Sequence, residues 1–295
     1  MPKPKISIVV ISYDMCRELP RTLYTLRAPY QKSLTNDEID IVVVDNGSKD
    51  DVMINEEWSN VRSYHMQNPT HSPVKAINFG LTQAKADFIG VMIDGARMAS
   101  PNMLHYALLA SKVSERTVVS TMAYHLGSEV QMKSVPKGYN QKVEDELLET
   151  VPWHADGYSL FDISVFAGSS APGWFKSIAE TNALFMGKNL WNELGGYDER
   201  FSTPGGGLVN LDTYLRATEL CDSVAIRLLG EGTFHQVHGG VATNQQRADA
   251  TYKIFHEEYK KIRNKPFAAP ERDEILFGRV RQSHKQHAHY SLDKL

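Results

Sequence analysis

The sequence predicts an α/β fold in which one mixed, mostly parallel sheet is flanked by helices and followed by a helical C-terminal extension. Continuous apolar, β-branched runs at 6–11 and 39–44 are typical of strands buried in a parallel sheet. The segment 18–26 between them carries leucines at helical spacing. Strand and helix patterns then alternate to about Ser120, as they do in right-handed βαβ units.

Turn-forming residues end the predicted strands of the N-terminal half. The first strand ends at Ser12, and the second stops at Asp45, where Asn46 and Gly47 favour a turn. A later apolar run closes on Asp94. Because ligands collect at the carboxyl ends of parallel strands, Ser12, Asp45 and Asp94 are predicted to face one site. The other elements predicted here are strands at 61–66 and 88–93 and a helix at 73–84.

The second half of the chain has a weaker pattern. Residues 124–176 are rich in Gly, Ser, Pro and aromatic residues, which predicts a specificity region. Its Trp153 and Trp174, like Trp191 further on, would either stack on sugar faces or pack in the core. The last residues, rich in His and Lys, predict a surface tail. A structured stretch is predicted to resume near 183–186, with a strand near 223–229, helices near 209–216 and 249–262, and domain limits at 1–245 and 246–295.

Composition excludes some functions. The 295 residues carry a formal net charge of only -3, and the scattered lysines and arginines provide no broad basic surface for nucleic acid. Cys16 and Cys221 suit reduced thiols in the cytoplasm. The start lacks a signal-peptide pattern, and no 18-residue apolar span occurs. We therefore expect a soluble cytoplasmic protein, with peripheral contact at the inner face of the membrane left open and the oligomeric state unspecified.

From about residue 6 to residue 240, the sequence resembles the family 2 glycosyltransferases, which have the GT-A fold. The resemblance is carried by Ile8-Val9-Val10-Ile11-Ser12-Tyr13, by Ile41-Val42-Val43-Val44-Asp45-Asn46-Gly47-Ser48, and by Lys75, Asn78, Gly80 and Asp94. It implies transfer of a sugar, with inversion, from a nucleotide diphosphate sugar, with UDP favoured. The acceptor would be a glycan, a lipid-linked molecule or another hydroxyl compound in polysaccharide or glycoconjugate biosynthesis.

The resemblance also implies a donor site. Asp45 would contact the base, and Asp94 would be the first acid of an Asp-x-Asp element that approaches the ribose and a divalent cation, Mn or Mg. The place of the second acid is taken by Ala96, so the usual metal carboxylate is absent. Arg97 could instead supply positive charge to the diphosphate, because a guanidinium binds phosphate oxygens in pairs. The donor-binding residues expected are Ser12, Tyr13, Asp45, Lys75, Asp94, Gly95 and Arg97.

His235 and His238 form a second candidate group. Imidazoles at this spacing either bind a divalent ion or phosphate, or simply pack in a loop. The resemblance favours a role for His238 near the diphosphate. If Asp94, His235 and His238 together hold the metal, they compensate in part for Ala96.

The catalytic base is less well defined. Inverting transfer needs a carboxylate that accepts the acceptor's proton. The Glu-Asp pair that many relatives carry has become Val209 and Asn210, so Asp212 is the first candidate, followed by Asp198 and Glu180. These departures keep open a nucleotide-sugar-binding or scaffolding protein that has lost turnover. A nucleotidyltransferase is a third alternative, but residues 12–17 lack the glycine-rich phosphate loop of such enzymes.

Overall fold

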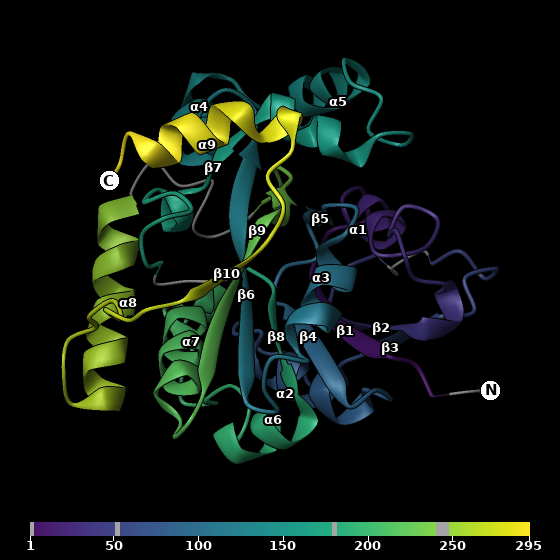
Figure 1. The fold of residues 1–295 in the computed structure, drawn as a ribbon. Coiled ribbons are helices and arrows are strands. Elements are labelled where there is room, and N and C mark those ends of the chain that lie inside the picture. The colour runs from purple at the N-terminus through teal and green to yellow at the C-terminus, as the bar shows by residue number, and fades with distance from the viewer. Residues whose placement is uncertain (1–2, 51–53, 179–181, 240–247) are drawn as a thin grey trace.

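A computed structural model describes residues 3–50, 54–178, 182–239 and 248–295 of the chain (Figure 1). Its strands are β1 (Ile6–Ser12), β2 (Ile39–Asp45), β3 (Val61–His65), β4 (Phe88–Met92), β5 (Arg97–Ala99), β6 (Thr117–Leu126), β7 (Ser164–Phe166), β8 (Leu184–Gly187), β9 (Val224–His235) and β10 (Ile275–Gly278). Its α-helices are α1 (Leu19–Thr25), α2 (Val74–Gln83), α3 (Met103–Ala110), α4 (Gln131–Ser134), α5 (Gln141–Glu149), α6 (Lys188–Leu194), α7 (Val209–Glu219), α8 (Ala248–Arg263) and α9 (Lys285–Leu292). Among these described helices, none has the length and apolar character needed to cross a bilayer.

The strands form one mixed sheet in the order β10-β9-β6-β8-β4-β1-β2-β3, with β5 paired to β9 and β7 paired to β6. The predicted parallel arrangement of the N-terminal strands is confirmed, since β1 runs parallel to both β2 and β4, and β2 runs parallel to β3. The antiparallel strand β8 lies between β4 and β6. Parallel pairing places the carboxyl ends of β1, β2 and β4 at one edge of the sheet.

The alternation of side chains along β1 explains the two helical layers. Ile8 and Val10 belong to a core that also contains Leu23 of α1 and residues of α3. Val9 and Ile11 belong to a second core, shared with α2, α6, α7 and α8. Both faces of the sheet are therefore covered by helices, and truncating one such buried aliphatic side chain to alanine typically costs about 2–5 kcal/mol.

A third core consists mainly of aromatic residues from the middle of the chain. Tyr124 stacks on Phe166 at 4.9 Å between ring centroids and accepts a hydrogen bond from Trp174 Nε1 at 2.9 Å. Trp174 is fully buried, as is most of Trp191, whose Nε1 donates to the carbonyl of Ile89 at 3.0 Å. These two tryptophans are core residues, so part of the predicted specificity region is scaffold.

The predicted helical C-terminal extension is confirmed, but the prediction of a surface tail at its end is wrong. Strand β10 pairs in parallel with β9, and α9 lies against the aromatic core beside β7 (Figure 1). His284 and His287 are buried there, and Ser291 Oγ accepts a hydrogen bond from the backbone N–H of Trp174 at 3.0 Å. Burial of the apolar surface of the aromatic core by this C-terminal segment is favourable, and it outweighs the cost of burying the segment's polar side chains.

Candidate functional site

Asp45 and Asp94 lie at the same edge of the sheet, on either side of β1. Ser12 and Asp45 are partners in the β1–β2 register, and Val10 pairs with Met92, two residues before Asp94. Ser12 is fully buried, and its Oγ has no hydrogen-bond partner among the described residues. The three residues predicted to share a site therefore come together at the carboxyl ends of adjacent strands.

The carboxylate of Asp45 is buried and already hydrogen bonded. Its Oδ1 accepts from the backbone N–H of Ser48 at 3.1 Å and from the Ser48 hydroxyl at 2.6 Å, which closes the turn after β2. Its Oδ2 lies 2.7 Å from Nδ1 of His65, the register partner on β3. His65 was not predicted, because only the pairing of β2 with β3 brings it to Asp45.

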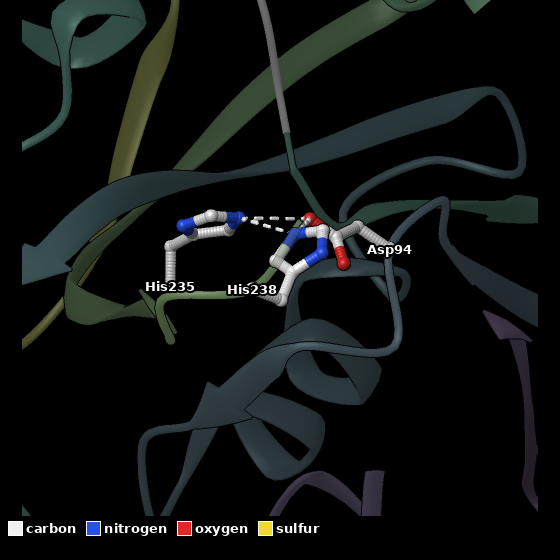
Figure 2. A group of neighbouring side chains, drawn as sticks. All are labelled: Asp94, His235 and His238. Carbon is white, nitrogen blue, oxygen red and sulfur yellow. Dashed lines mark hydrogen bonds and ion pairs between the residues drawn. The ribbon is translucent and has the colours of Figure 1, made fainter. Parts of the chain in front are cut away.

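Asp94, His235 and His238 form a compact group (Figure 2). Asp94 Oδ2 lies 3.0 Å from His235 Nε2 and 3.5 Å from His238 Nε2, and the two Nε2 atoms are 3.2 Å apart. The side chain of His235 is 1% exposed, and those of His238 and Asp94 are 10% and 15% exposed. One carboxylate oxygen and two imidazole nitrogens thus meet at the sheet edge in a largely dry environment.

The pairing of β5 with β9 brings these residues together. Arg97 is the register partner of His235, and the N–H of Gln236 donates to the carbonyl of Ala96 at 2.8 Å. Ala96, at the position of the expected second acid, is fully buried. Gly95 is needed beside it because a Cβ there would lie 2.9 Å from the carbonyl oxygen of Ile11. The sheet therefore supplies His235, 141 residues from Asp94, next to the position that lacks a carboxylate.

Gln131 of α4 sets the tautomer of His235. Its amide Nε2 donates to the carbonyl of His235 at 3.0 Å, so its Oε1, 2.5 Å from His235 Nδ1, accepts the ring proton. His235 Nε2 then presents a lone pair to Asp94 Oδ2, itself an acceptor. Lone pairs that converge in this way fit a cation, and a second hydrogen bond that fixes the ligating nitrogen is typical of metal-binding histidines. No sequence pattern indicated Gln131.

The electrostatics of the group follow from burial and from its own charges. Burial opposes ionisation of Asp94, but the charges of His238 and Arg97 outweigh it and hold the pKa of Asp94 well below its usual value. Burial and the charge of Arg97 lower the pKa of His235 to about 4. Burial also acts against protonation of His238, yet the Asp94 carboxylate raises its pKa. His238 is therefore the imidazole that takes up a proton, and a divalent cation would replace that proton.

Arg97 adds positive charge to the same place. Its Nη2 lies 3.4 Å from Asp94 Oδ2, and its side chain is 11% exposed. Its Nε and Nη1 are buried and have no hydrogen-bond partner among the described residues. Buried donors without partners are costly, and a guanidinium fork matches the oxygens of a phosphate group. The cluster thus combines a place that fits a cation with free donors for an anion.

Charged residues of α5 and of the segment just before α1 support the loop that carries His238. The buried Glu144 accepts a hydrogen bond from the N–H of Val237 at 2.7 Å, and Arg17 lies 3.3 Å from Glu144 and 2.8 Å from Glu18. Burial raises the pKa of Glu144 to about 7. Sequence reasoning missed these residues, because isolated charged residues at such separations form no recognisable motif.

The other residues expected at the nucleotide-sugar site lie outside the group of Asp94, His235 and His238. Tyr13 is 53% exposed just after β1, and Lys75 is exposed in the first turn of α2. Asn78 has a structural role, since its amide donates to the carbonyl of Tyr197 and accepts from its N–H at 2.9 and 3.0 Å. No contact among the described residues joins Tyr13 or Lys75 to Asp94.

Two of the expected bases lie in a separate group of ion pairs. Asp212 in the first turn of α7 is 1% exposed and binds Arg263 of α8 through both oxygens, at 2.6 Å each, and Arg216 at 2.8 Å. Asp198 binds Arg263 at 2.8 Å and Arg200 at 2.6 Å. The structure thus brings Asp212 and Asp198 together through Arg263, but no described contact links them to Asp94. Glu180 lies outside the described residues.

The family model described as glycosyl transferase family 2 matches residues 7–167, which is more than half of the chain. The chain belongs to glycosyl transferase family 2. The matched region contains β1, β2 and β4 with Asp45 and Asp94, while His235 and His238 lie beyond it. A search of curated proteins found no match to this family 2 chain.

The solved structures that resemble this family 2 protein include S. aureus TarS. Its fragment 1–349 with UDP-GlcNAc superposes with a TM-score of 0.57 at 13% identity, covering 98% of this chain and 72% of that one. The same fragment with UDP gives 0.51 at 14% identity, covering 87% and 71%. A longer TarS structure gives 0.51 at 15% identity, covering 98% of this chain and 43% of that one. These likenesses confirm the expected GT-A fold.

Proposed function

We propose that this family 2 protein transfers a sugar from a nucleotide diphosphate sugar, with UDP as the favoured nucleotide, to a hydroxyl acceptor. The observation that carries the proposal is the meeting of Asp94, His235 and His238 beside the unpartnered donors of Arg97. One arrangement thereby offers a place for a cation and a place for phosphate oxygens. The TarS fragment was solved with UDP-GlcNAc and with UDP, which supports a donor of this chemical class.

The donor would lie across the carboxyl ends of β1, β2 and β4. In this arrangement the base of the nucleotide contacts Asp45 and Tyr13, and Ser12 supplies a buried hydroxyl between Asp45 and Asp94. Asp45 keeps Oδ1 for its turn, so the base competes with His65 for Oδ2. Lys75, exposed on α2, and Gly95, whose lack of a side chain permits close approach, complete the proposed donor site.

Asp94, His235 and His238 would hold the divalent cation, Mn or Mg. Two imidazoles and one carboxylate favour Mn over Mg, because Mg prefers oxygen ligands. When bound, the cation neutralises charge on the diphosphate as the glycosidic bond breaks. Arg97 contributes two further N–H donors to the same leaving group, and Gln131 keeps the Nε2 lone pair of His235 directed at the cation.

Asp212 is retained as the proposed base, with Asp198 and Glu180 as alternatives. The contacts of Asp212 argue for a structural role in addition, because its carboxylate would have to release one arginine before it could accept a proton. The departure of Arg263 would also loosen α8 from α7. A base and a helix anchor therefore predict different outcomes for the Asp212→Ala variant.

Calorimetry with UDP and GDP, with and without Mn, tests the proposed function. We expect UDP to bind the intact protein more tightly when Mn is present, and we expect Asp45→Ala and Asp94→Ala to weaken binding. Asp87→Ala is a matched control, since Asp87 is an exposed aspartate whose side chain, among the described residues, pairs only with Lys3 at the protein surface. Failure of the intact protein to bind either nucleotide would exclude the proposal.

A nucleotide-sugar-binding protein without turnover is the second candidate. It is favoured by Ala96, by Val209 and Asn210 in place of the acidic pair, and by the closed ion pairs of Asp212. Incubation of a UDP-sugar with the protein and a panel of hydroxyl acceptors, followed by measurement of UDP release, separates the two candidates. Donor binding without release of UDP would favour the binding protein.

A further inference from the structure

A cavity of about 780 Å³ lies between α1 and α5, apart from the donor site. Its walls include Arg21 and Tyr24 of α1, Trp58 before β3, Asp145 and Glu149 of α5, and Trp153 after that helix. None of these residues was assigned to donor, metal or base. The volume falls in the range of about 300–1,000 Å³ that is usual for small-molecule sites.

Three aromatic rings in the wall are held in place by neighbouring groups. Tyr24 and Trp153 meet edge to face, with centroids 5.6 Å apart and an interplanar angle of 87°. The guanidinium of Arg27 lies 4.5 Å above the ring of Trp58. Unlike Trp174 and Trp191, neither Trp58 nor Trp153 uses its indole N–H in a hydrogen bond within the described residues. Trp153 is only 5% exposed, and the ring of His154 lies 3.5 Å from its own, so the partly exposed Trp58 is the indole that offers an apolar face to a ligand.

The charged groups of the wall define the kind of ligand that fits. Arg21 Nη2 binds Asp145 Oδ1 at 2.5 Å, whereas Arg21 Nη1 is buried with no partner among the described residues. Glu149 is exposed and engages no described group. The positive charge of Arg21 disfavours a cation, and the two carboxylates disfavour an anion. A neutral ligand with apolar C–H faces and many hydroxyl groups matches both the rings and the polar atoms.

We propose that this cavity binds a neutral saccharide unit of the acceptor, an inference that rests on the proposed glycosyl transfer. One face of a pyranose ring would stack on an indole, while its hydroxyls donate to Asp145 or Glu149 and accept from Arg21. The cavity would thus hold an extended acceptor at a sugar distant from the reacting hydroxyl.

A chain of polar contacts links the wall of the cavity to the group of Asp94, His235 and His238. Asp145 Oδ1 also accepts from Arg17 at 2.7 Å, and Arg17 contacts Glu144, which binds the backbone of Val237 next to His238. Neighbouring residues of α5 therefore contact the two sites, Asp145 at the cavity and Glu144 at the histidine loop. An acceptor chain held in the cavity would lie against α5, the helix whose Glu144 contacts the loop of His238.

Tryptophan fluorescence of the full chain tests the proposal. The probes are cellotriose, maltotriose, mannotriose and N-acetylated chitotriose, with choline and inorganic phosphate as charged comparison ligands. We expect a saturable change with at least one trisaccharide and none with choline or phosphate. No saturable response to any of the four trisaccharides would overturn the proposal, and so would a response to choline or phosphate alone.

Variants in the cavity wall, with a control elsewhere on α5, make the test specific to the cavity. Glu149→Gln should weaken binding of the responding trisaccharide, and Trp58→Ala should weaken it about tenfold, as expected for the loss of an aromatic contact. Glu146→Gln is the matched control, because Glu146 lies on the same helix and is exposed outside the cavity wall. Circular dichroism confirms that each variant is folded, and equal affinity in Glu149→Gln, Trp58→Ala and Glu146→Gln would assign the saccharide to another place and overturn the proposal.

UDP calorimetry on the same preparation separates the cavity from the donor site. If UDP binds and no trisaccharide does, the cavity proposal fails and the proposed donor site stands. If a trisaccharide binds in the cavity and UDP does not bind, the proposed function fails, and with it the assignment of the saccharide as an acceptor.

Discussion

Asp94 and Asp212 are carboxylates of low exposure, 15% and 1%, that face positively charged groups, yet their surroundings differ. Arg263 and Arg216 make hydrogen bonds to both oxygens of Asp212. Asp94 instead faces two imidazoles whose neutral forms can bind a metal and an arginine with two nitrogens that have no partner among the described residues. The group around Asp212 is complete without a ligand, whereas the group around Asp94 has unused coordination and donor capacity. This difference, rather than burial or charge alone, separates a structural ion pair from a candidate site.

The largest expected effect is on folding, at Asp212. Asp212→Ala removes the buried partner of Arg216 and Arg263, of which Arg263 keeps its ion pair with Asp198, and should lower the free energy of unfolding by about 3–5 kcal/mol. Urea denaturation measures this change. Glu193→Ala is the control, because its ion pair with Arg116 is exposed and contributes about 0–1 kcal/mol. Unchanged stability together with complete loss of sugar transfer would instead identify Asp212 as a base without a structural role.

At Asp94 the expected effect is on ligand binding. Asp94→Ala removes one of three cation ligands and should weaken Mn-dependent UDP binding about 100-fold, at the upper end of the effects seen when a metal site is disturbed. It also removes the carboxylate that compensates the charge of Arg97, so protein stability should fall as well. The fall should be smaller than in Asp212→Ala, where two arginines lose the same partner. Calorimetry measures the affinity, and an unchanged Mn dependence would remove Asp94 from the metal site.

A smaller effect is expected from Gln131, which contacts His235 and none of the other ligands. Gln131→Leu should weaken Mn affinity about tenfold, because His235 loses the group that fixes its tautomer. Manganese titration followed by electron paramagnetic resonance measures the affinity. Gln141→Leu, which removes a contact to Glu18 instead, serves as the comparison. Equal effects of the two changes would show that general loosening of the structure, and not the tautomer, is responsible.

The smallest effect concerns pH. The Asp94 carboxylate raises the pKa of His238, so protons compete with the cation for this imidazole. Mn affinity should therefore fall several-fold as the pH is lowered through the raised pKa of His238. The sign follows because only the neutral imidazole binds metal. Among the described residues, Asp212 is paired with arginines and not with an imidazole, so no cation site competes with protons there. Mn titrations at a series of pH values test the difference.

The two groups also differ in how far the sequence predicts them. Apolar runs place Asp45 and Asp94 at strand ends, and the parallel sheet that these runs indicate is enough to bring both acids to one edge. His235 and His238 are candidates from spacing alone. Their meeting with Asp94 depends on the register of β5 with β9, and register between segments so distant in sequence cannot be read from local patterns.

Other parts of the molecule depend on tertiary packing. Gln131 acts through a hydrogen bond from a short helix, and no motif marks it. His284 and His287 belong to a segment whose composition is typical of a surface tail, but both are buried against the aromatic core. Arg263 pairs with Asp212 although the two are 51 residues apart in sequence, and no pattern around Asp212 predicts a buried ion pair. Local sequence describes the strands well, but not the side-chain partners that complete a site.

Calorimetric titration of UDP at several fixed Mn concentrations, using the intact protein and His238→Ala, tests whether Asp94, His235 and His238 bind a cation that helps to hold the diphosphate. We expect UDP affinity to rise with Mn in the intact protein and to lose this dependence in His238→Ala, while the weaker Mn-independent binding remains. UDP affinity that is the same at every Mn concentration in the intact protein would contradict this role of the cation.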